Sequence, residues 1–168
     1  HRDQHSFPTR RSSDLMLSED KTLEILKKTN SLLEGHFILS SGLRSEKYLQ
    51  CAQLMMHADY AKIICESLAS KIKKEKINFD LVASPAIGGI LVGYEVSKFL
   101  NVPNIFVERV DNKFSLRRGF DCKDKNILIV EDVITTGKSS IECAECLKGL
   151  GGPVSGYACI VDRSGGNS

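Results

Sequence analysis

Residues 126–140 read NILIVEDVITTGKSS, and this stretch decides the fold. Its first five residues, Asn126–Val130, are mostly apolar without alternating polarity, which is typical of a strand buried on both faces of a parallel sheet. Two acids, Glu131 and Asp132, follow directly. A short turn with threonine and glycine comes next, and then Ser139–Leu150, which has the pattern of a helix. We therefore predict an α/β protein with this strand–turn–helix unit at its centre.

Turns of this kind are where open α/β sheets bind phosphorylated ligands, because the free N–H groups and the positive end of the helix face the anion. The two carboxylates would repel a phosphate, so they suit ribose hydroxyls or a Mg²⁺ ion held through water. The carboxylates can bind the sugar hydroxyls, and the adjacent backbone amides can bind the phosphate of the same molecule. This combination predicts a site for ribose 5-phosphate. The alternative is an ordinary Rossmann-like turn that binds no ligand.

The tripeptide Gly137-Lys138-Ser139 resembles the end of a Walker A loop, which would instead indicate nucleoside triphosphate binding. That loop requires a further glycine five residues before Gly137, in the pattern G-x-x-x-x-G-K-[ST]. The residue at this position is Asp132, whose side chain would crowd the phosphates. The sequence therefore argues against a Walker A loop.

The segment VEDVITTGKSS resembles the phosphoribosyl-pyrophosphate (PRPP) signature of type I phosphoribosyltransferases, with an apolar run, two acids, two apolar residues and a turn of small residues. Four other segments make residues 17–166 similar to the orotate phosphoribosyltransferase family: GHFILSSGLRSEKYLQ at 35–50, SPAIGGILVGYE at 84–95, FVERVDNKFSLRRGF at 106–120 and VDRSGG at 161–166. The resemblance implies the type I fold, a central, mainly parallel sheet flanked by helices with a small N-terminal hood over the base. It also implies transfer of ribose 5-phosphate from PRPP to orotate.

By resemblance, PRPP binds to a set of residues centred on the signature: Glu131, Asp132, Val133, Ile134, Thr135, Thr136, Gly137, Lys138, Ser139, Arg109 and Lys113. The implied catalytic residues are Asp132, Glu131 and Lys113. A second loop, consisting of Ala86, Ile87, Gly88 and Gly89, is implied to contact the pyrophosphate. Some relatives have a lysine at the position of Gly88, so backbone amides and Mg²⁺ would contribute more here. The implied cofactor is Mg²⁺, bound through PRPP and waters with no direct protein ligand.

The residues implied to contact orotate are Thr135, Arg163, Tyr48 and Leu49. Arg163 follows a predicted strand, and its planar, two-pronged donor suits a carboxylate. The alternatives are a surface salt bridge for Arg163 and simple core packing for Tyr48. Better-known family members carry a lysine where this chain has Ser40, and Lys47 or Arg44 are candidates to replace its charge.

A basic segment, Arg109–Lys125, has no periodicity and contains six cations: Arg109, Lys113, Arg117, Arg118, Lys123 and Lys125. We interpret it as a loop long enough to form a lid, although a solvated crossover would look similar. The resemblance implies closure over the active site, often that of a neighbouring subunit, and hence a homodimer. Some members use a histidine in this loop, whereas this segment has none.

The composition limits the alternatives. Residues 16–168 have the length of one domain, and a net charge of +2 favours neither nucleic acid nor a membrane surface as a partner. Six scattered cysteines indicate reduced thiols in a cytoplasmic protein, and Cys143 and Cys146 lie mid-helix, where core packing is the better account than a metal or redox pair. Two functional alternatives stay open: a purine phosphoribosyltransferase and a regulator that only senses PRPP.

Residues 1–15 show no hydrophobic periodicity, and we predict a non-native leader, with a transit peptide or a basic arm as alternatives. A first helix follows, with Ser18 as its N-cap. We further predict strands at His36–Leu39, Lys47–Cys51, Phe79–Ala83, Ile105–Glu108 and Val154–Val161 and helices at Asp59–Lys74 and Ile90–Leu100. Family members normally continue beyond the last strand, so we expect a chain truncated at its C-terminus.

Overall fold

The fold is described from a computed structural model, which covers residues 16–38, 42 and 44–164. The predicted leader at 1–15, the end of the predicted strand at Leu39, and Ser40 lie outside the described residues. The elements along the chain are α1 (Glu19–Lys28), β1 (Leu32–Ile38), β2 (Arg44–Leu49), α2 (Cys51–Met55), α3 (Ala58–Lys74), β3 (Leu81–Pro85), α4 (Gly88–Leu100), β4 (Asn104–Val110), β5 (Lys113–Leu116), β6 (Ile127–Ile134), α5 (Lys138–Gly149) and β7 (Val154–Asp162).

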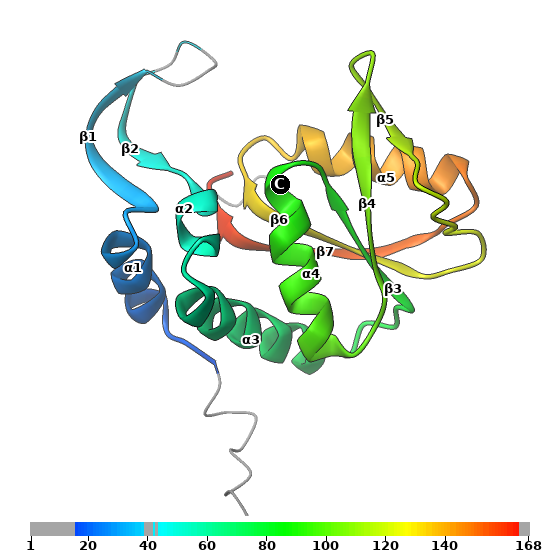
Figure 1. Ribbon diagram of the computed structural model, residues 1–168, viewed down its shortest axis with the longest axis horizontal. Helices are drawn as coiled ribbons and strands as arrows, with labels where there is room; N and C mark the ends of the chain where they lie inside the picture. Colours follow the sequence, from blue (N-terminus) through cyan, green and yellow to red (C-terminus); the bar gives the residue numbers. More distant parts are fainter. Residues whose placement is uncertain (1–15, 39–41, 43, 165–168) are drawn as a thin grey trace, which may run out of the picture.

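The main sheet has the strand order β5-β4-β3-β6-β7. β3 pairs in parallel with β4 and β6, β6 pairs in parallel with β7, and only β5 runs antiparallel. A separate two-stranded sheet, β1–β2, stands beside α1 and α2 at the N-terminal side (Figure 1). The predicted α/β fold, with a mainly parallel sheet and a small N-terminal hood, is confirmed.

Helices cover both faces of the main sheet, as Figure 1 shows. On one face, α3 and α4 pack on β3 and β6 through a cluster that includes Val82, Val92 and Leu128. On the other face, α5 packs through a cluster that includes Ile129 and Leu147. β3 and β6 are therefore apolar on both sides, which explains their runs of consecutive hydrophobic residues.

β6 is longer than predicted, because it ends at Ile134 and not at Val130. Its continued pairing with β7, which includes Glu131↔Cys159 and Ile134↔Asp162, keeps the chain extended past both acids. The two acids therefore belong to the strand rather than to the turn that follows it. Neighbouring side chains on a strand point to opposite faces, so the two carboxylates diverge.

The prediction of an aperiodic segment at Arg109–Lys125 is wrong for its first half. β4 continues to Val110, and β5 folds back on it with the pairing Val110↔Lys113. The two residues between them, Asp111 and Asn112, have φ angles of 50° and 63°. A two-residue turn with both φ positive is the type that matches the twist of paired strands, and aspartate and asparagine tolerate it.

Most remaining boundaries shift by a few residues. β3 starts two residues later than predicted, at Leu81, where pairing with β6 begins, and pairing with β4 begins at Val82. α4 starts at Gly88 rather than Ile90. The hood strands also differ: β1 already begins at Leu32, and Cys51 begins α2 instead of ending a strand.

The predicted N-cap of the first helix is confirmed. The Ser18 hydroxyl accepts a hydrogen bond from the backbone N–H of Lys21, with an N–O distance of 3.3 Å. Two acids follow in the first turn and two lysines end the helix, which complements its dipole. The helix is thereby set at the base of the hood, where Leu26 packs with Leu54 and Ile64.

Candidate active site

The candidate site lies at the carboxyl edge of the parallel strands. From β3 the chain crosses to β4 on one side, whereas β6 and β7 lie on the other. The order therefore reverses between β3 and β6, and at such a switch point the connections leave a crevice beyond the strand ends. α4 and α5 both begin at this edge, directly after the loops that leave β3 and β6 (Figure 1).

Asp132 and Gly88 meet across this switch point. A Cβ atom added to Gly88 would lie 2.6 Å from Oδ2 of Asp132, so the carboxylate occupies the place of the missing side chain at the first residue of α4. No side chain caps this N-terminus. The pKa of Asp132 is raised by burial, while hydrogen bonds from the backbone N–H of Val133 and its own N–H oppose that shift. Asp132 remains partly open to solvent.

Glu131 points to the opposite face of β6 and is only 6% exposed. Its Oε1 accepts a hydrogen bond from the hydroxyl of Ser140, on the first turn of α5, at 2.8 Å. The pKa of Glu131 is raised by burial and, to a lesser extent, by the charge of Asp132, whereas the Ser140 hydrogen bond lowers it. The two acids that adjoin in sequence therefore contact different helices.

The turn between β6 and α5 presents a helix N-terminus. Gly137, the N-cap, has a φ of 73°, a conformation that favours glycine, and it forms no side-chain cap. The Thr136 hydroxyl accepts from the N–H of Lys138 at 3.3 Å. Residues 135–139, which are predicted to bind a phosphate, thus surround a helix start whose N-cap residue makes no side-chain hydrogen bond. Val133 and Ile134 directly precede them at the end of β6.

The predicted pyrophosphate loop follows β3 at the same edge. Ala86 is anchored by a hydrogen bond from its N–H to the carbonyl of Val107 on β4, at 2.8 Å. Ile87 is 86% exposed, and the peptide bond between Ala86 and Ile87 is cis. Gly89 packs closely, since an added Cβ would lie 3.3 Å from Ser84 on β3 and from the carbonyl of Val130 on β6.

Two of the cations in the basic segment are held by acids. Arg109 donates to Glu142 on α5 at 2.6 Å and stacks 4.1 Å above the ring of Phe114. Arg118 forms two hydrogen bonds with Glu108, at 2.7 and 2.8 Å.

For Lys113 and Arg117 the described part of the chain contains no ion pair. Lys113 lies on β5 next to the hairpin turn, at a tip of the hairpin that extends past the sheet (Figure 1). The hairpin tip therefore presents Lys113, which has no ion pair among the described residues, on a strand that pairs only with β4.

Arg163 connects the main sheet to the hood. Its backbone N–H donates to the carbonyl of Ile134 at 2.8 Å, which fixes it at the end of β7 beside β6. Its Nη2 lies 3.4 Å from the hydroxyl of Ser45 on β2, a residue 118 positions away in sequence.

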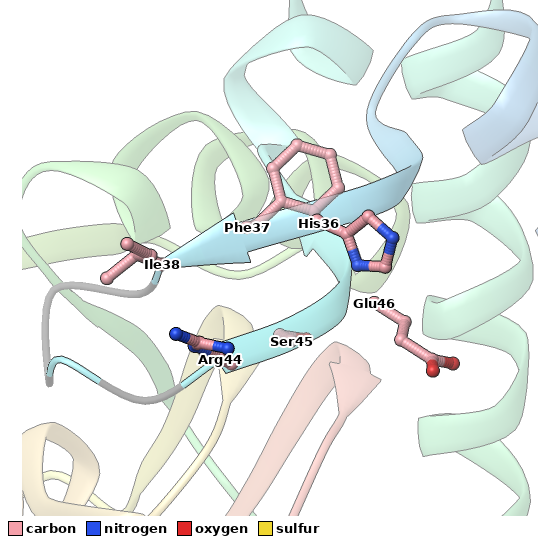
Figure 2. Close-up of a pocket in the computed structure, with 6 residues that line it drawn as sticks. All are labelled: His36, Phe37, Ile38, Arg44, Ser45 and Glu46. Carbon is pink, nitrogen blue, oxygen red and sulfur yellow. The ribbon is translucent and has the colours of Figure 1, made fainter.

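Ser45 also lines a cavity of about 500 Å³ on the hood, together with His36, Phe37, Ile38, Arg44 and Glu46. Figure 2 shows Ile38 at the end of β1 and Arg44 at the start of β2, with His36 and Glu46 farther along the two strands. Of the two candidates to replace the family lysine, Arg44 therefore lines the cavity next to Arg163, whereas Lys47 does not.

Tyr48 and Leu49, predicted to contact the base, alternate on β2. The Tyr48 ring packs 5.6 Å from that of Phe37, and its hydroxyl donates to Gln50 at 2.9 Å. Leu49 packs toward the cluster of Leu26, Leu54 and Ile64. Of the two residues, Tyr48 is therefore the more exposed, at 37%.

Comparison with known proteins decides the family. The model of the phosphoribosyl transferase domain matches residues 56–168. The orotate phosphoribosyltransferase of Carboxydothermus hydrogenoformans is 46% identical over 144 residues, which cover 85% of this chain and 75% of that protein. The chain therefore belongs to the orotate phosphoribosyltransferase family. The orotate phosphoribosyltransferase of Brucella ovis is 45% identical over 153 residues, covering 90% of this chain and 80% of that protein.

Among solved structures, the UMP synthase of Leishmania donovani superimposes with a TM-score of 0.76 at 22% identity, over 90% of this chain and 33% of that one. This orotate phosphoribosyltransferase family member therefore has the type I fold that its PRPP signature indicated. The described residues contain no group of three or more histidine, cysteine or acidic side chains able to hold a metal ion directly. No helix among those residues is both long and apolar enough to cross a bilayer.

In this orotate phosphoribosyltransferase family member, sequence reasoning missed several contacts at the site. Ser140, which binds Glu131, follows the signature turn and carried no signal, because nothing local indicates which acid it faces. Glu142, the partner of Arg109, looked like an ordinary helix-surface acid. The hairpin could have been found from Asp111-Asn112, a pair that accepts positive φ, between two extended segments.

Proposed function

We propose that this chain transfers ribose 5-phosphate from PRPP to orotate and releases pyrophosphate, the reaction that the names of its relatives describe. The observation that carries the proposal is the convergence at one sheet edge of Asp132, set against Gly88, and the uncapped start of α5. A sugar phosphate has hydroxyls for the acid and an anion for the amides. The arrangement suits both ends of one ligand.

In this proposal the backbone N–H groups of Thr135, Thr136, Gly137, Lys138 and Ser139 bind the 5′-phosphate, since a helix N-terminus favours an anion. Val133 and Ile134 form the strand end beneath it. Asp132 on the α4 side of β6 and Glu131 on its α5 side lie at two sides of the ribose. They stabilise the positive charge that develops on its ring as the bond to pyrophosphate loosens, so that catalysis relies on preorganised charge.

The leaving pyrophosphate lies between the loop 86–89 and the hairpin. Ala86, Ile87, Gly88 and Gly89 offer backbone N–H groups at the start of α4, and Lys113 and Arg109 offer positive charge. Lys113 is the stronger candidate, because the structure already engages Arg109 with Glu142. Movement of the hairpin toward the loop would exclude water from the reaction.

Mg²⁺ fits this site through the substrate rather than through protein ligands. The partly open carboxylate of Asp132 stands beside the proposed diphosphate position. When bound, the ion would supply charge neutralisation for the diphosphate. Asp132 would then hold the ribose and the waters around the ion in place.

For orotate we propose Arg163 as the partner of the carboxylate, with the Thr135 hydroxyl on the base side and Tyr48 and Leu49 shaping the hood. The contact between Arg163 and Ser45 supports this, since it puts a two-pronged donor next to the hood cavity. Arg44 lines the same cavity and adds a second cation for an acidic base.

No side chain acts as a nucleophile in this proposal. Burial raises the pKa values of three thiols, Cys51, Cys65 and Cys143, to about 12, so they stay protonated at neutral pH. All six cysteines are free, and a cytoplasmic location is part of the proposal. A homodimer is also part of the proposal.

The test is release of pyrophosphate from PRPP with each of three acceptors: orotate, adenine and hypoxanthine. We expect turnover with orotate alone, and loss of turnover when EDTA removes Mg²⁺. Turnover with a purine would favour the purine alternative, and PRPP binding without turnover would favour the sensor. Neither alternative is favoured by the relatives that are 45–46% identical.

A further inference from the structure

Ser140 makes the one side-chain hydrogen bond to Glu131 in the described part of the chain. Both residues are largely buried, with Glu131 6% and Ser140 4% exposed. The bond engages only Oε1. The described residues form no hydrogen bond with Oε2, and Oε2 is not among their fully buried unpartnered atoms, so this second oxygen keeps some contact with solvent.

Glu131 has little other polar support. No cation forms an ion pair with it among the described residues, and the nearby Asp132 adds a second negative charge. A buried carboxylate without a donor adopts whatever rotamer reduces its exposure to apolar groups and like charge. The Ser140 hydroxyl therefore determines where this side chain points.

Ser140 also belongs to the first turn of α5, which begins at Lys138. The same turn supplies the amides proposed to hold the 5′-phosphate. The Ser140 hydroxyl donates to Glu131 from this same turn. The first turn of α5 therefore fixes the distance between the proposed phosphate site and the Glu131 carboxylate. Rigid support of this kind keeps reacting groups within the small tolerance that catalysis requires.

We propose that Ser140 is a positioning residue, whose hydroxyl holds the Glu131 carboxylate so that its free oxygen faces the ribose of PRPP during transfer. The inference rests on the proposed function. Nothing in the signature pattern assigns this role to Ser140, and the residue acts only through Glu131.

The structure also provides a conservative variant. Ser140 lines a cavity of about 440 Å³ between α5 and β7, together with Ile141, Tyr157 and Cys159. The extra methyl group of threonine has room there, so Ser140→Thr keeps the hydroxyl whereas Ser140→Ala removes it. Ser70 is the matched control, because it is a buried helix serine (6% exposed) whose hydroxyl bonds only the carbonyl of Glu66 on α3, away from the site.

The experiment measures kcat and KM for PRPP with orotate as acceptor in the full chain and these three variants. We expect Ser140→Ala to lower kcat at least about 10-fold, or about 1.4 kcal/mol, with KM changed less than about threefold. Ser140→Thr and Ser70→Ala should stay within about threefold of the wild type. Wild-type kcat in Ser140→Ala, or an equal loss in Ser140→Thr, would overturn the inference.

A double-mutant cycle tests whether Ser140 acts through Glu131 and distinguishes this role from a general folding defect. In a Glu131→Gln background, Ser140→Ala should cost less than about twofold in kcat, since the carboxylate it positions is gone. Full additivity would show that the serine does not act through Glu131 and would overturn the role. A wild-type chain without orotate-dependent turnover would instead refute the proposed function, which separates the two failures.

Discussion

The carboxylate of Asp132 occupies the space that a side chain on Gly88 would need. An added Cβ would lie 2.6 Å from Oδ2 and 3.1 Å from Oδ1, well inside contact distance. These residues come from β6 and from the start of α4, which meet at the switch point of the sheet. The observed orientation of Asp132 therefore requires that residue 88 has no side chain.

Replacement of Gly88 by alanine should displace Asp132 and lower kcat/KM for PRPP at least about 10-fold, which corresponds to about 1.4 kcal/mol. Gly149→Ala is the control, because the last residue of α5 has nothing within 4 Å of an added Cβ. Steady-state kinetics on both variants tests this. Equal kinetics in the two would mean that the Asp132 carboxylate moves without consequence.

Asp132→Asn removes the charge proposed to stabilise the ribose cation while keeping the shape of the side chain. We expect kcat/KM to fall at least about 10-fold, more than about 1.4 kcal/mol. Asp59→Asn, at an exposed site in the first turn of α3, should leave kcat/KM unchanged. Normal turnover in Asp132→Asn would remove this acid from the mechanism.

The same Asp132→Asn variant should be more stable than the wild type at neutral pH. Burial raises the pKa of Asp132 above its ordinary value of 3.8, so the folded state favours the protonated acid. The stability due to protonation is fully present below pH 3.8 and is lost as the pH rises through the raised value. The Tm difference between variant and wild type should thus be positive at pH 7.5 and shrink toward pH 3.5, as thermal unfolding would measure. A constant difference would contradict this.

Arg163→Ala should weaken orotate use selectively. A hydrogen-bonded pair with a charged group contributes about 1.5–3 kcal/mol, so kcat/KM for orotate should fall about 10- to 150-fold. Binding of PRPP, measured by calorimetry, should stay within about threefold. Arg163→Lys should not restore activity, because an ammonium lacks the two-pronged geometry. A comparable loss of PRPP affinity would mean that Arg163 does not act selectively on orotate.

The pair Arg109–Glu142 offers a way to separate structural from substrate contacts. Both side chains are partly exposed, at 39% and 33%, so the pair itself contributes at most about 1 kcal/mol to stability. Glu142→Gln should therefore leave Tm and kcat/KM nearly unchanged, whereas Arg109→Ala should lower kcat/KM for PRPP about 10-fold or more. Similar losses in both variants would mean that Arg109 acts only through Glu142.

Local sequence was sufficient to predict the elements that depend only on neighbouring residues. The buried run before Glu131, the glycine turn and the helix after it follow from composition and spacing, as does the Ser18 cap. The PRPP signature lies within this unit, so the family was evident from contiguous residues. Boundaries were less certain, because β6 stays extended past its apolar run only through its pairing with β7.

Tertiary structure decided the contacts between segments far apart in the chain. Strand order, which depends on how the whole sheet packs, brings Gly88 to Asp132 and Arg163 to Ser45. The strand geometry of β6 turns Glu131 toward Ser140 and Asp132 the other way, although the two acids adjoin in sequence. Such relationships depend on which face of an element is covered and by what, and no local pattern of residues contains that information.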